Sequence, residues 1–274
     1  MSSKKVGLAL GGGAVRGLAH IGVLAVLEKE GIPIDLIVGT SAGAIVGSLY
    51  ARERDASQIK RQLIDLAQQK LTRFIDPALP RTGLIKGKKI KDLLASFMGG
   101  DIKFSHLRIP FACVATDIDS GEEVVIDRGS VPEAVRASIS IPALFTVVKR
   151  GGRYLVDGGL VSPVPVDLAK RMGADFVIAV NVIPDVADRV HRVTKEGMKD
   201  FKAPNIIHIV MQSIYVGTSS LVRSNLEGAD IVIEPKVAHI GAGDFHHAEE
   251  CIRQGELAAQ SSIPEIKRKL EALS

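Results

Sequence analysis

Two short apolar runs, each leading through glycine into a helical pattern, constrain the fold of this chain more than any other feature. The first run covers residues 6–10, ends in three glycines at 11–13, and is followed by apolar residues at helical spacing over 16–30. The second covers residues 35–38 and is followed by a helical pattern over 42–51. A strand that passes directly into a helix is the repeating unit of parallel sheets. The sequence therefore predicts an α/β fold.

The rest of the chain continues this alternation. Further strand patterns lie at 109–116, 122–126, 153–156, 176–182 and 231–234. Further helical patterns lie at 55–71, 131–140 and 206–226, and at 245–273, where we expect two helices broken near Pro264. Residues 74–91, rich in proline and glycine, predict an irregular connection. We predict one domain over residues 1–274, a three-layer sandwich with a central, mostly parallel sheet covered by helices on both faces.

Composition sets the expected compartment and partners. The formal net charge of +4 is mild, and the charges are spread along the chain, so we expect no nucleic-acid partner. Four lysines between residues 86 and 91 predict either a membrane-touching face or a solvated helix start. The two cysteines lie far apart, and no stretch is apolar enough to cross a membrane. We expect a cytoplasmic protein, with peripheral membrane contact as an option, and neither a metal nor a cofactor.

One segment differs from the rest in its lack of large apolar side chains. Residues 184–204 are charged and hold few groups that a core could bury. A segment of this composition gains little from packing against the rest of the protein. We therefore predict a mobile loop or lid over 184–204.

The motif Gly39-Thr40-Ser41-Ala42-Gly43 matches G-x-S-x-G between a predicted strand and a predicted helix. Gly39 and Gly43 permit a sharp turn that exposes the Ser41 hydroxyl at the top of the sheet. The helix that begins there favours negative charge developing on the serine oxygen or its substrate. The simpler interpretation is that Ser41 only caps this helix. We take Ser41 as the candidate nucleophile.

The three consecutive glycines form the second candidate element of a site. Their amides are unshielded by Cβ atoms and lie beside the end of the second predicted strand, so Gly11, Gly12 and Gly13 are the predicted oxyanion hole. Arg16 follows one turn later, where its charge opposes the helix dipole. We expect Arg16 to fix the loop by bonding carbonyl groups, with contact to a phosphate as the alternative.

A nucleotide site is the rival interpretation of this glycine loop. The dinucleotide pattern G-x-G-x-x-G fails because the last glycine is displaced to Gly17, and no acidic residue follows the second strand. A P-loop fails because Leu18 stands where the lysine must be. A nucleotide-binding module therefore ranks behind an acyl hydrolase.

A serine nucleophile needs a base, and none of the seven histidines is clearly placed for that role. Asp157 follows the strand pattern at 153–156, and Gly158 and Gly159 after it let another backbone approach. A carboxylate in a partly dry cleft has a raised pKa and can accept the serine proton directly. Because Asp-Gly-Gly is also a common turn, these residues alone leave both interpretations open.

Three motifs together resemble the patatin-like phospholipase family. They are Gly-Gly-Gly-Ala-Val-Arg-Gly at 11–17, Gly-Thr-Ser-Ala-Gly at 39–43 and Asp-Gly-Gly at 157–159, and their order and spacing make the match specific. Residues 136–145 are similar to the family's segment before the aspartate. The resemblance covers about residues 5–182 and is closest to the small, single-domain bacterial members.

The resemblance implies a catalytic dyad of Ser41 and Asp157 without histidine, with oxyanion donors from the glycine loop. It also implies metal-free hydrolysis of lipid acyl esters through an acyl-enzyme, which releases fatty acid from membrane lipids. One alternative is a carboxylesterase or thioesterase acting on small soluble esters. Another is a regulatory, non-catalytic protein on the same fold. The residues do not determine the acyl length, the head group or the oligomeric state.

Overall fold

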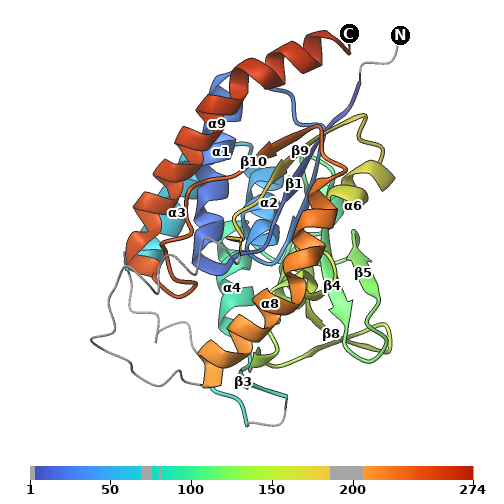
Figure 1. Ribbon diagram of the computed structural model, residues 1–274. Helices are drawn as coiled ribbons and strands as arrows, with labels where there is room; N and C mark the ends of the chain where they lie inside the picture. The colour runs from blue at the N-terminus through green and yellow to red at the C-terminus, as the bar shows by residue number, and fades with distance from the viewer. Residues whose placement is uncertain (1–3, 69–75, 80–81, 186–205, 274) are drawn as a thin grey trace, which may run out of the picture.

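The computed structural model describes residues 4–68, 76–79, 82–185 and 206–273. Its main sheet has the strand order β10-β9-β1-β2-β4-β8-β7, and β5 pairs with β4 outside this path (Figure 1). The strands are β1 (Val6–Leu10), β2 (Leu36–Thr40), β4 (Phe111–Asp117), β5 (Glu123–Ile126), β7 (Val148–Arg150), β8 (Arg153–Asp157), β9 (Phe176–Val180) and β10 (Ile231–Ile233). The five strands from β10 to β4 are parallel, whereas β5, β7 and β8 pair antiparallel. The predicted α/β class with a mostly parallel sheet is confirmed.

Helices cover both faces of this sheet. One face carries α1 (Ala19–Lys29), α2 (Ala42–Glu53), α3 (Ala56–Gln68), α5 (Val131–Ser138) and α9 (Ala248–Glu271). The other face carries α6 (Val166–Arg171) and α8 (Ile206–Leu226) (Figure 1). Leu8 and Leu10 of β1 point into the first layer, and Ala9 between them points into the second. This alternation explains why the central strands are apolar throughout their length.

The layer with α1 and α9 depends on two glycines at their crossing. A Cβ added to Gly22 of α1 would lie 2.0 Å from the carbonyl oxygen of Ile252 in α9. A Cβ added to Gly255 of α9 would lie 1.9 Å from the carbonyl oxygen of Ala19. Both distances are far inside van der Waals contact, and the atoms that would be hit belong to backbone. The two helices can therefore pack at this distance only because both positions are glycine.

We expect Gly255→Ala to lower the free energy of unfolding by about 1–3 kcal/mol, because the added methyl must push α9 away from α1. Urea denaturation of the two proteins measures this difference. The matched control is Gly217→Ala in α8, where an added Cβ meets no atom within 4 Å. That variant should gain up to about 1 kcal/mol from helix propensity alone. Equal effects of the two substitutions would contradict the packing argument.

The structure corrects two expectations about local structure. Residues 74–91 hold more regular structure than predicted, because β3 (Gly83–Ile85) pairs with β6 (Ala143–Phe145) and α4 (Lys88–Phe97) begins there. The C-terminal region forms α9 as one helix that continues through Pro264. Pro264 is exposed, while Ile263 and Ile266 beside it are buried. Burial on the inner face therefore outweighs the one backbone hydrogen bond that proline removes on the outer face.

Two further expectations concern loops and membranes. The predicted lid at 184–204 lies outside the described residues, except for its first two positions. Among the described helices, none is long and apolar enough to cross a membrane.

Candidate active site

Ser41 lies at the sharp turn between β2 and α2. Its backbone angles are φ 53° and ψ −118°, an unusual conformation for a residue with a side chain. A Cβ at Gly39 would lie 2.6 Å from the Gly43 carbonyl oxygen, and one at Gly43 would lie 2.1 Å from the Leu10 carbonyl oxygen. The close approach of these backbones thus requires both glycines. Within this turn the unusual backbone angles fall on Ser41, whose side chain lines the pocket.

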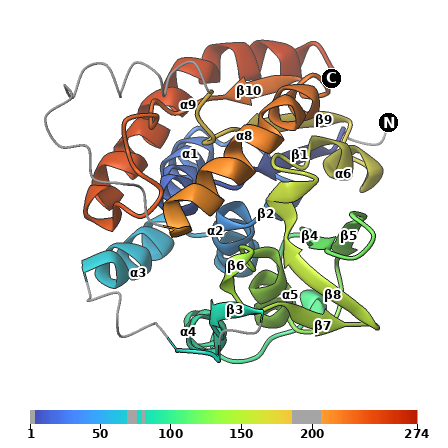
Figure 2. The ribbon, with the colours of Figure 1, turned by 60° about the horizontal axis from the view of Figure 1, so that its bottom comes forward.

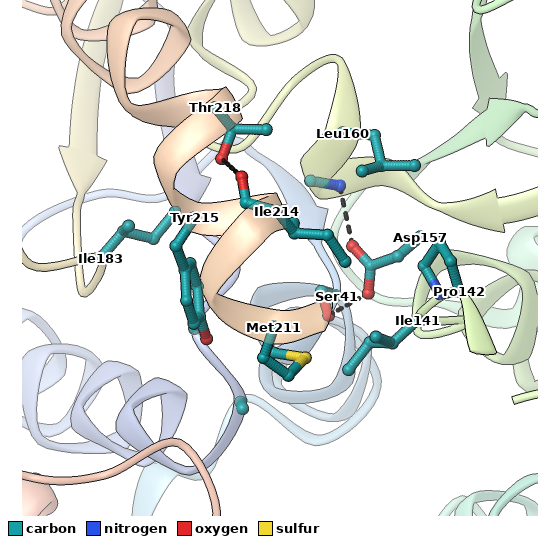
Figure 3. Close-up of a pocket in the computed structure, with 13 residues that line it drawn as sticks. Ser41, Ile141, Pro142, Asp157, Leu160, Ile183, Met211, Ile214, Tyr215 and Thr218 are labelled. Carbon is teal, nitrogen blue, oxygen red and sulfur yellow. Dashed lines mark hydrogen bonds between the residues drawn. The ribbon is translucent and has the colours of Figure 1, made fainter. Parts of the chain in front are cut away.

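Asp157 reaches Ser41 through the register of three strands. Thr40 of β2 pairs with Val114 of β4, and the next residue of β4, Ala115, pairs with Asp157 of β8. Because β8 runs antiparallel to β4, its last residue ends at the level where β2 delivers Ser41. Ser41 Oγ donates a hydrogen bond of 2.6 Å to Asp157 Oδ2 (Figure 3). The sequence predicted both strand ends but not the reversal of β8.

The Asp157 carboxylate is buried and held in place from its other oxygen. Asp157 is 7% exposed, and its Oδ1 accepts the N–H of Gly159 at 2.8 Å. Burial raises the pKa of Asp157 from 3.8 to about 6, against the opposing effect of the hydrogen bonds from Ser41 and Gly159. A Cβ at Gly158 would lie 2.3 Å from the Val114 carbonyl oxygen, so this glycine lets β4 approach. The carboxylate is ionised at neutral pH and close enough to its own pKa to exchange a proton readily.

The glycine loop uses two of its predicted donors inside the fold. The N–H of Gly11 donates to Val180 at 3.0 Å, and the N–H of Gly12 donates to Pro163 at 2.9 Å, in each case to the carbonyl oxygen. Gly11 and Gly12 thus hold the loop to its neighbours, which corrects the expectation that they serve as oxyanion donors. Gly13 and Ala14 line the pocket that contains Ser41. Within the part of the chain that the structure describes, no protein acceptor binds the N–H of either.

Arg16 bonds a carbonyl group, but one from a distant segment. Its Nε donates to the carbonyl oxygen of Ile240 at 2.7 Å, and its guanidinium lies over the ring of Tyr215 at 5.7 Å from the centroid. Arg16 is 5% exposed. The N–H of Val15 donates to Ala242 of the same distant segment at 3.3 Å. Arg16 therefore ties the start of the glycine loop's helix to the C-terminal part of the chain and to α8.

His20 binds the glycine loop through a backbone carbonyl group. Its Nε2 lies 2.8 Å from the Gly11 carbonyl oxygen, and the ring is fully buried. Burial lowers the pKa of His20 to about 4, against the opposing effect of the Gly11 hydrogen bond, so the ring is neutral at pH 7 and donates this bond from Nε2–H. Of the histidines whose side chains the structure describes, none lines the Ser41 pocket.

Three serine and threonine side chains fix the backbone around the site by hydrogen bonds. None of them had a role in the motifs. Ser138 Oγ accepts the N–H of Ser41 at 2.9 Å. Thr116 Oγ1 donates to the carbonyl oxygen of Asp157, and Thr40 Oγ1 donates to that of Ser162, both at 2.8 Å. Their signal in the sequence was weak, because small hydroxyl residues at strand ends and turns are common. Thr40 stands in the motif at 39–43 and Ser138 in the segment at 136–145, but neither pattern assigned them a role.

A pocket opens in front of Ser41 and Asp157, and α8 forms one wall of it (Figure 3). The α8 side chains Met211, Ile214, Tyr215 and Thr218 face Ile141, Pro142, Leu160 and Ile183 from the sheet side. The pocket is almost wholly apolar apart from Ser41, Asp157, Thr218 and the Tyr215 hydroxyl. Its volume of about 40 Å³ holds a few water molecules. The sequence predicted α8 with the correct bounds but not its position over the nucleophile.

No group of three or more His, Cys, Asp or Glu residues suited to hold a metal ion occurs among the described residues. Both cysteines are free and buried. Burial raises the pKa of the Cys113 thiol to about 12. Neither cysteine lines the pocket that contains Ser41 and Asp157.

Comparison with known proteins agrees with this geometry. The family model described as patatin-like phospholipase matches residues 8–170. An uncharacterized NTE family protein of Mycobacterium tuberculosis is 38% identical over 181 residues, which cover 66% of this chain and 50% of that protein. The human patatin-like phospholipase domain-containing protein 6 is 36% identical over 188 residues, 66% of this chain and 14% of that protein.

Two further similarities cover nearly the whole chain at lower identity. Another Mycobacterium tuberculosis NTE family protein is 29% identical over 285 aligned residues, 96% of this chain and 47% of that protein. The crystal structure of VipD from Legionella pneumophila aligns with 94% of this chain and 67% of its own, at 14% identity and a TM-score of 0.48. The chain spans about half the length of its mycobacterial relatives. Since the family match runs from β1 through the Ser41 and Asp157 segments into α6, the chain belongs to the patatin-like phospholipase family.

Proposed function

We propose that this chain is a serine acyl-ester hydrolase that releases fatty acid from membrane lipids. The observation that carries the proposal is the hydrogen bond of 2.6 Å from Ser41 Oγ to a buried Asp157 carboxylate. A strained serine at a strand-to-helix turn, paired with a base of raised pKa at the mouth of an apolar pocket, is suited to acyl transfer. Family membership supports a lipid ester as the substrate.

In the first half of the reaction, Asp157 takes the Ser41 proton as Oγ attacks the ester carbonyl carbon. The carbonyl electron pair moves to oxygen, where the N–H groups of Gly13 and Ala14 stabilise the negative charge. When the tetrahedral intermediate collapses, the leaving alkoxide takes the proton from Asp157 and departs as an alcohol. The acyl group remains as an ester of Ser41.

In the second half, water attacks the acyl-enzyme and gives its proton to Asp157. The intermediate collapses, the proton returns to Ser41 Oγ, and a fatty acid leaves. The rigid Gly11 and Gly12 hydrogen bonds and the His20 contact keep the donor loop in one position through both steps. One carboxylate is sufficient as acid and base, because the proton that it accepts in each half-reaction is returned in the same half.

The test measures fatty-acid release from phosphatidylcholine and lysophosphatidylcholine, with p-nitrophenyl butyrate as a short soluble ester. Protein with Ser41→Ala gives the background for each substrate. The proposal predicts release from the lipids above this background. Hydrolysis of the aryl ester without any release from lipid would reject a membrane lipid as substrate and retain the hydrolase. No reaction with any of these esters would reject both the lipid substrate and the hydrolase activity.

The small pocket favours one alternative, a hydrolase of small soluble esters. About 40 Å³ is too little for a long acyl chain, so the pocket as it stands accepts a short acyl group. A longer chain requires Met211 and Ile214 of α8 to move aside. A steep preference for butyrate over palmitate esters in detergent solution would favour this alternative.

The raised pKa of Asp157 predicts the pH dependence of the reaction. Only the ionised carboxylate accepts the Ser41 proton, so kcat/KM should rise about tenfold per pH unit below the pKa and level off above about 6. The profile is measured with the soluble aryl ester, and circular dichroism at each pH verifies that the protein stays folded. A midpoint near 4, the value for an exposed aspartate, would contradict a buried base.

A further inference from the structure

The outer face of α8 lacks the charges expected of a helix in contact with water. Ile209 is 46% exposed and Val216, seven residues later on the same face, is 60% exposed. Ser213 and Gly217 are also exposed. Between Ile206 and Val222 the sequence contains no Lys, Arg, Asp or Glu. A solvent-facing helix of a globular protein normally carries charged residues on its outer face, so this face is suited to an apolar partner.

The opposite face of the same helix lines the active-site pocket. Met211, Ile214 and Tyr215 line it together with Ser41 and Asp157, and Figure 3 shows Met211 and Ile214 beside these two residues. In the part of the chain that the structure describes, α8 therefore has one face on the pocket and the other exposed. The family match ends at residue 170, before α8, so this surface belongs to the part of the chain that the family model does not cover.

A second exposed apolar feature lies beside α8. Strand β6 contacts α8 and pairs with β3, and Figure 2 shows β6 between α8 and β3, with α4 beside β3. Leu84 of β3 is 44% exposed, and Leu79, just before it, is 77% exposed. Leu84 thus lies on the strand pair that contacts α8, the helix that carries Ile209 and Val216.

Positive charge accompanies these leucines. Lys86, Lys88 and Lys89 follow β3 directly and are exposed, and Lys91 is partly exposed. Three carboxylates lie near these four lysines: Asp76 accepts backbone N–H groups at the start of α4, Asp92 pairs with Lys88, and Glu133 lies 3.7 Å from Lys91. Apolar side chains bordered by lysines match the boundary of a bilayer, where acyl chains lie beneath anionic phosphates.

We propose that Ile209, Val216, Leu79 and Leu84, together with Lys86, Lys88 and Lys89, form a docking surface for a bilayer containing anionic lipid. Docking brings α8 into the head-group region, where its outer face is solvated by acyl chains and its inner face can separate from the pocket. This docking surface rests on the proposed function, because that function assigns a lipid substrate. Binding itself does not depend on catalysis, so the two can be tested separately.

Vesicle flotation tests the docking surface in a Ser41→Ala background, in which lipid is not consumed. Vesicles of phosphatidylcholine alone and of phosphatidylcholine mixed with phosphatidylglycerol are compared. We expect binding to the mixed vesicles and, in Ile209→Glu/Val216→Glu and in Lys86→Glu/Lys89→Glu, a loss of roughly tenfold or more in affinity. The matched control is Leu257→Glu, 50% exposed on α9 across the sheet, which should bind like the parent.

Activity and oligomeric state complete the test. With Ser41 present, both double variants should hydrolyse the soluble aryl ester within about twofold of wild type, because the changed side chains point away from the pocket. Binding that survives both double variants, or falls equally with Leu257→Glu, would overturn the proposal. So would gel filtration showing a dimer that Ile209→Glu/Val216→Glu dissociates, since a second copy would then cover this face. If the wild-type protein does not hydrolyse the aryl ester, that result would instead reject the proposed function and leave the binding result valid.

Discussion

Replacing Ser41 by alanine should lower kcat for every ester substrate by roughly 10⁴-fold or more. Ser41 Oγ lines the pocket and donates a hydrogen bond to the buried Asp157 carboxylate, the proposed base. Without it no acyl-enzyme forms, and the remaining donors act on a reaction that lacks its nucleophile. Steady-state hydrolysis of the aryl ester measures the loss, and a fluorophosphonate probe, which labels activated serines, should modify wild type only.

The matched control is Ser48→Ala, seven residues along the same helix. Ser48 is fully buried, and its Oγ donates to the Ile45 carbonyl oxygen at 2.9 Å. Removing it costs one local hydrogen bond and should leave the aryl-ester activity within about twofold. Probe labelling of Ser41→Ala, or activity of that variant above a tenth of wild type, would mean that another residue is the nucleophile.

The variant Asp157→Asn should lose roughly 10³- to 10⁴-fold in kcat with little change in KM. An asparagine side chain has the same shape as aspartate and can keep the contacts to Ser41 and Gly159, but it cannot accept the Ser41 proton. Pre-steady-state measurement of alcohol release isolates the acylation step, and the whole loss in kcat should appear in that step. The pH dependence with midpoint near 6 should disappear from the residual activity.

The same variant should be more stable than wild type at high pH. Because the folded state raises the pKa of Asp157 from 3.8 to about 6, it binds this proton more tightly than the unfolded state does. The stability contributed by protonation is present below about pH 4 and is lost as the pH rises through about 6. At pH 8 the buried carboxylate is charged, so the free energy of unfolding of Asp157→Asn should be about 1–3 kcal/mol higher than that of wild type. Urea denaturation at pH 8 and pH 5 should show the difference shrinking toward low pH.

Asp117→Asn serves as the control for both effects. Asp117 is also 7% exposed, at the end of the neighbouring strand β4, and it lies 3.6 Å from Arg153 rather than beside Ser41. Its substitution should leave kcat within a few-fold of wild type and should not stabilise the protein at pH 8. Equal behaviour of the two asparagine variants would reject Asp157 as the base.

Local patterns in the sequence were sufficient for most of the fold. The apolar runs at 6–10 and 206–226 coincide with β1 and α8 as predicted. The neighbouring strand patterns at 109–116 and 122–126 correspond to the antiparallel pair β4 and β5, because short runs of strand-forming residues are local signals. The proline at 264 was misleading, since the burial of Ile263 and Ile266 comes from contacts with distant parts of the chain. A pattern confined to neighbouring residues contains no information about such contacts.

The candidate site divides in the same way. Local motifs were enough to name the candidate residues: a serine at a glycine-rich strand end, an aspartate at another, and a run of unshielded amides, because short motifs encode local backbone geometry. Which of these groups come into contact depends on the packing of the whole chain. The reversal of β8 puts Asp157 level with Ser41, Val180 and Pro163 occupy the amides of Gly11 and Gly12, and α8 closes the pocket. These outcomes depend on partners more than a hundred residues apart in the chain, whose contacts exist only once the sheet and its two helical layers are packed.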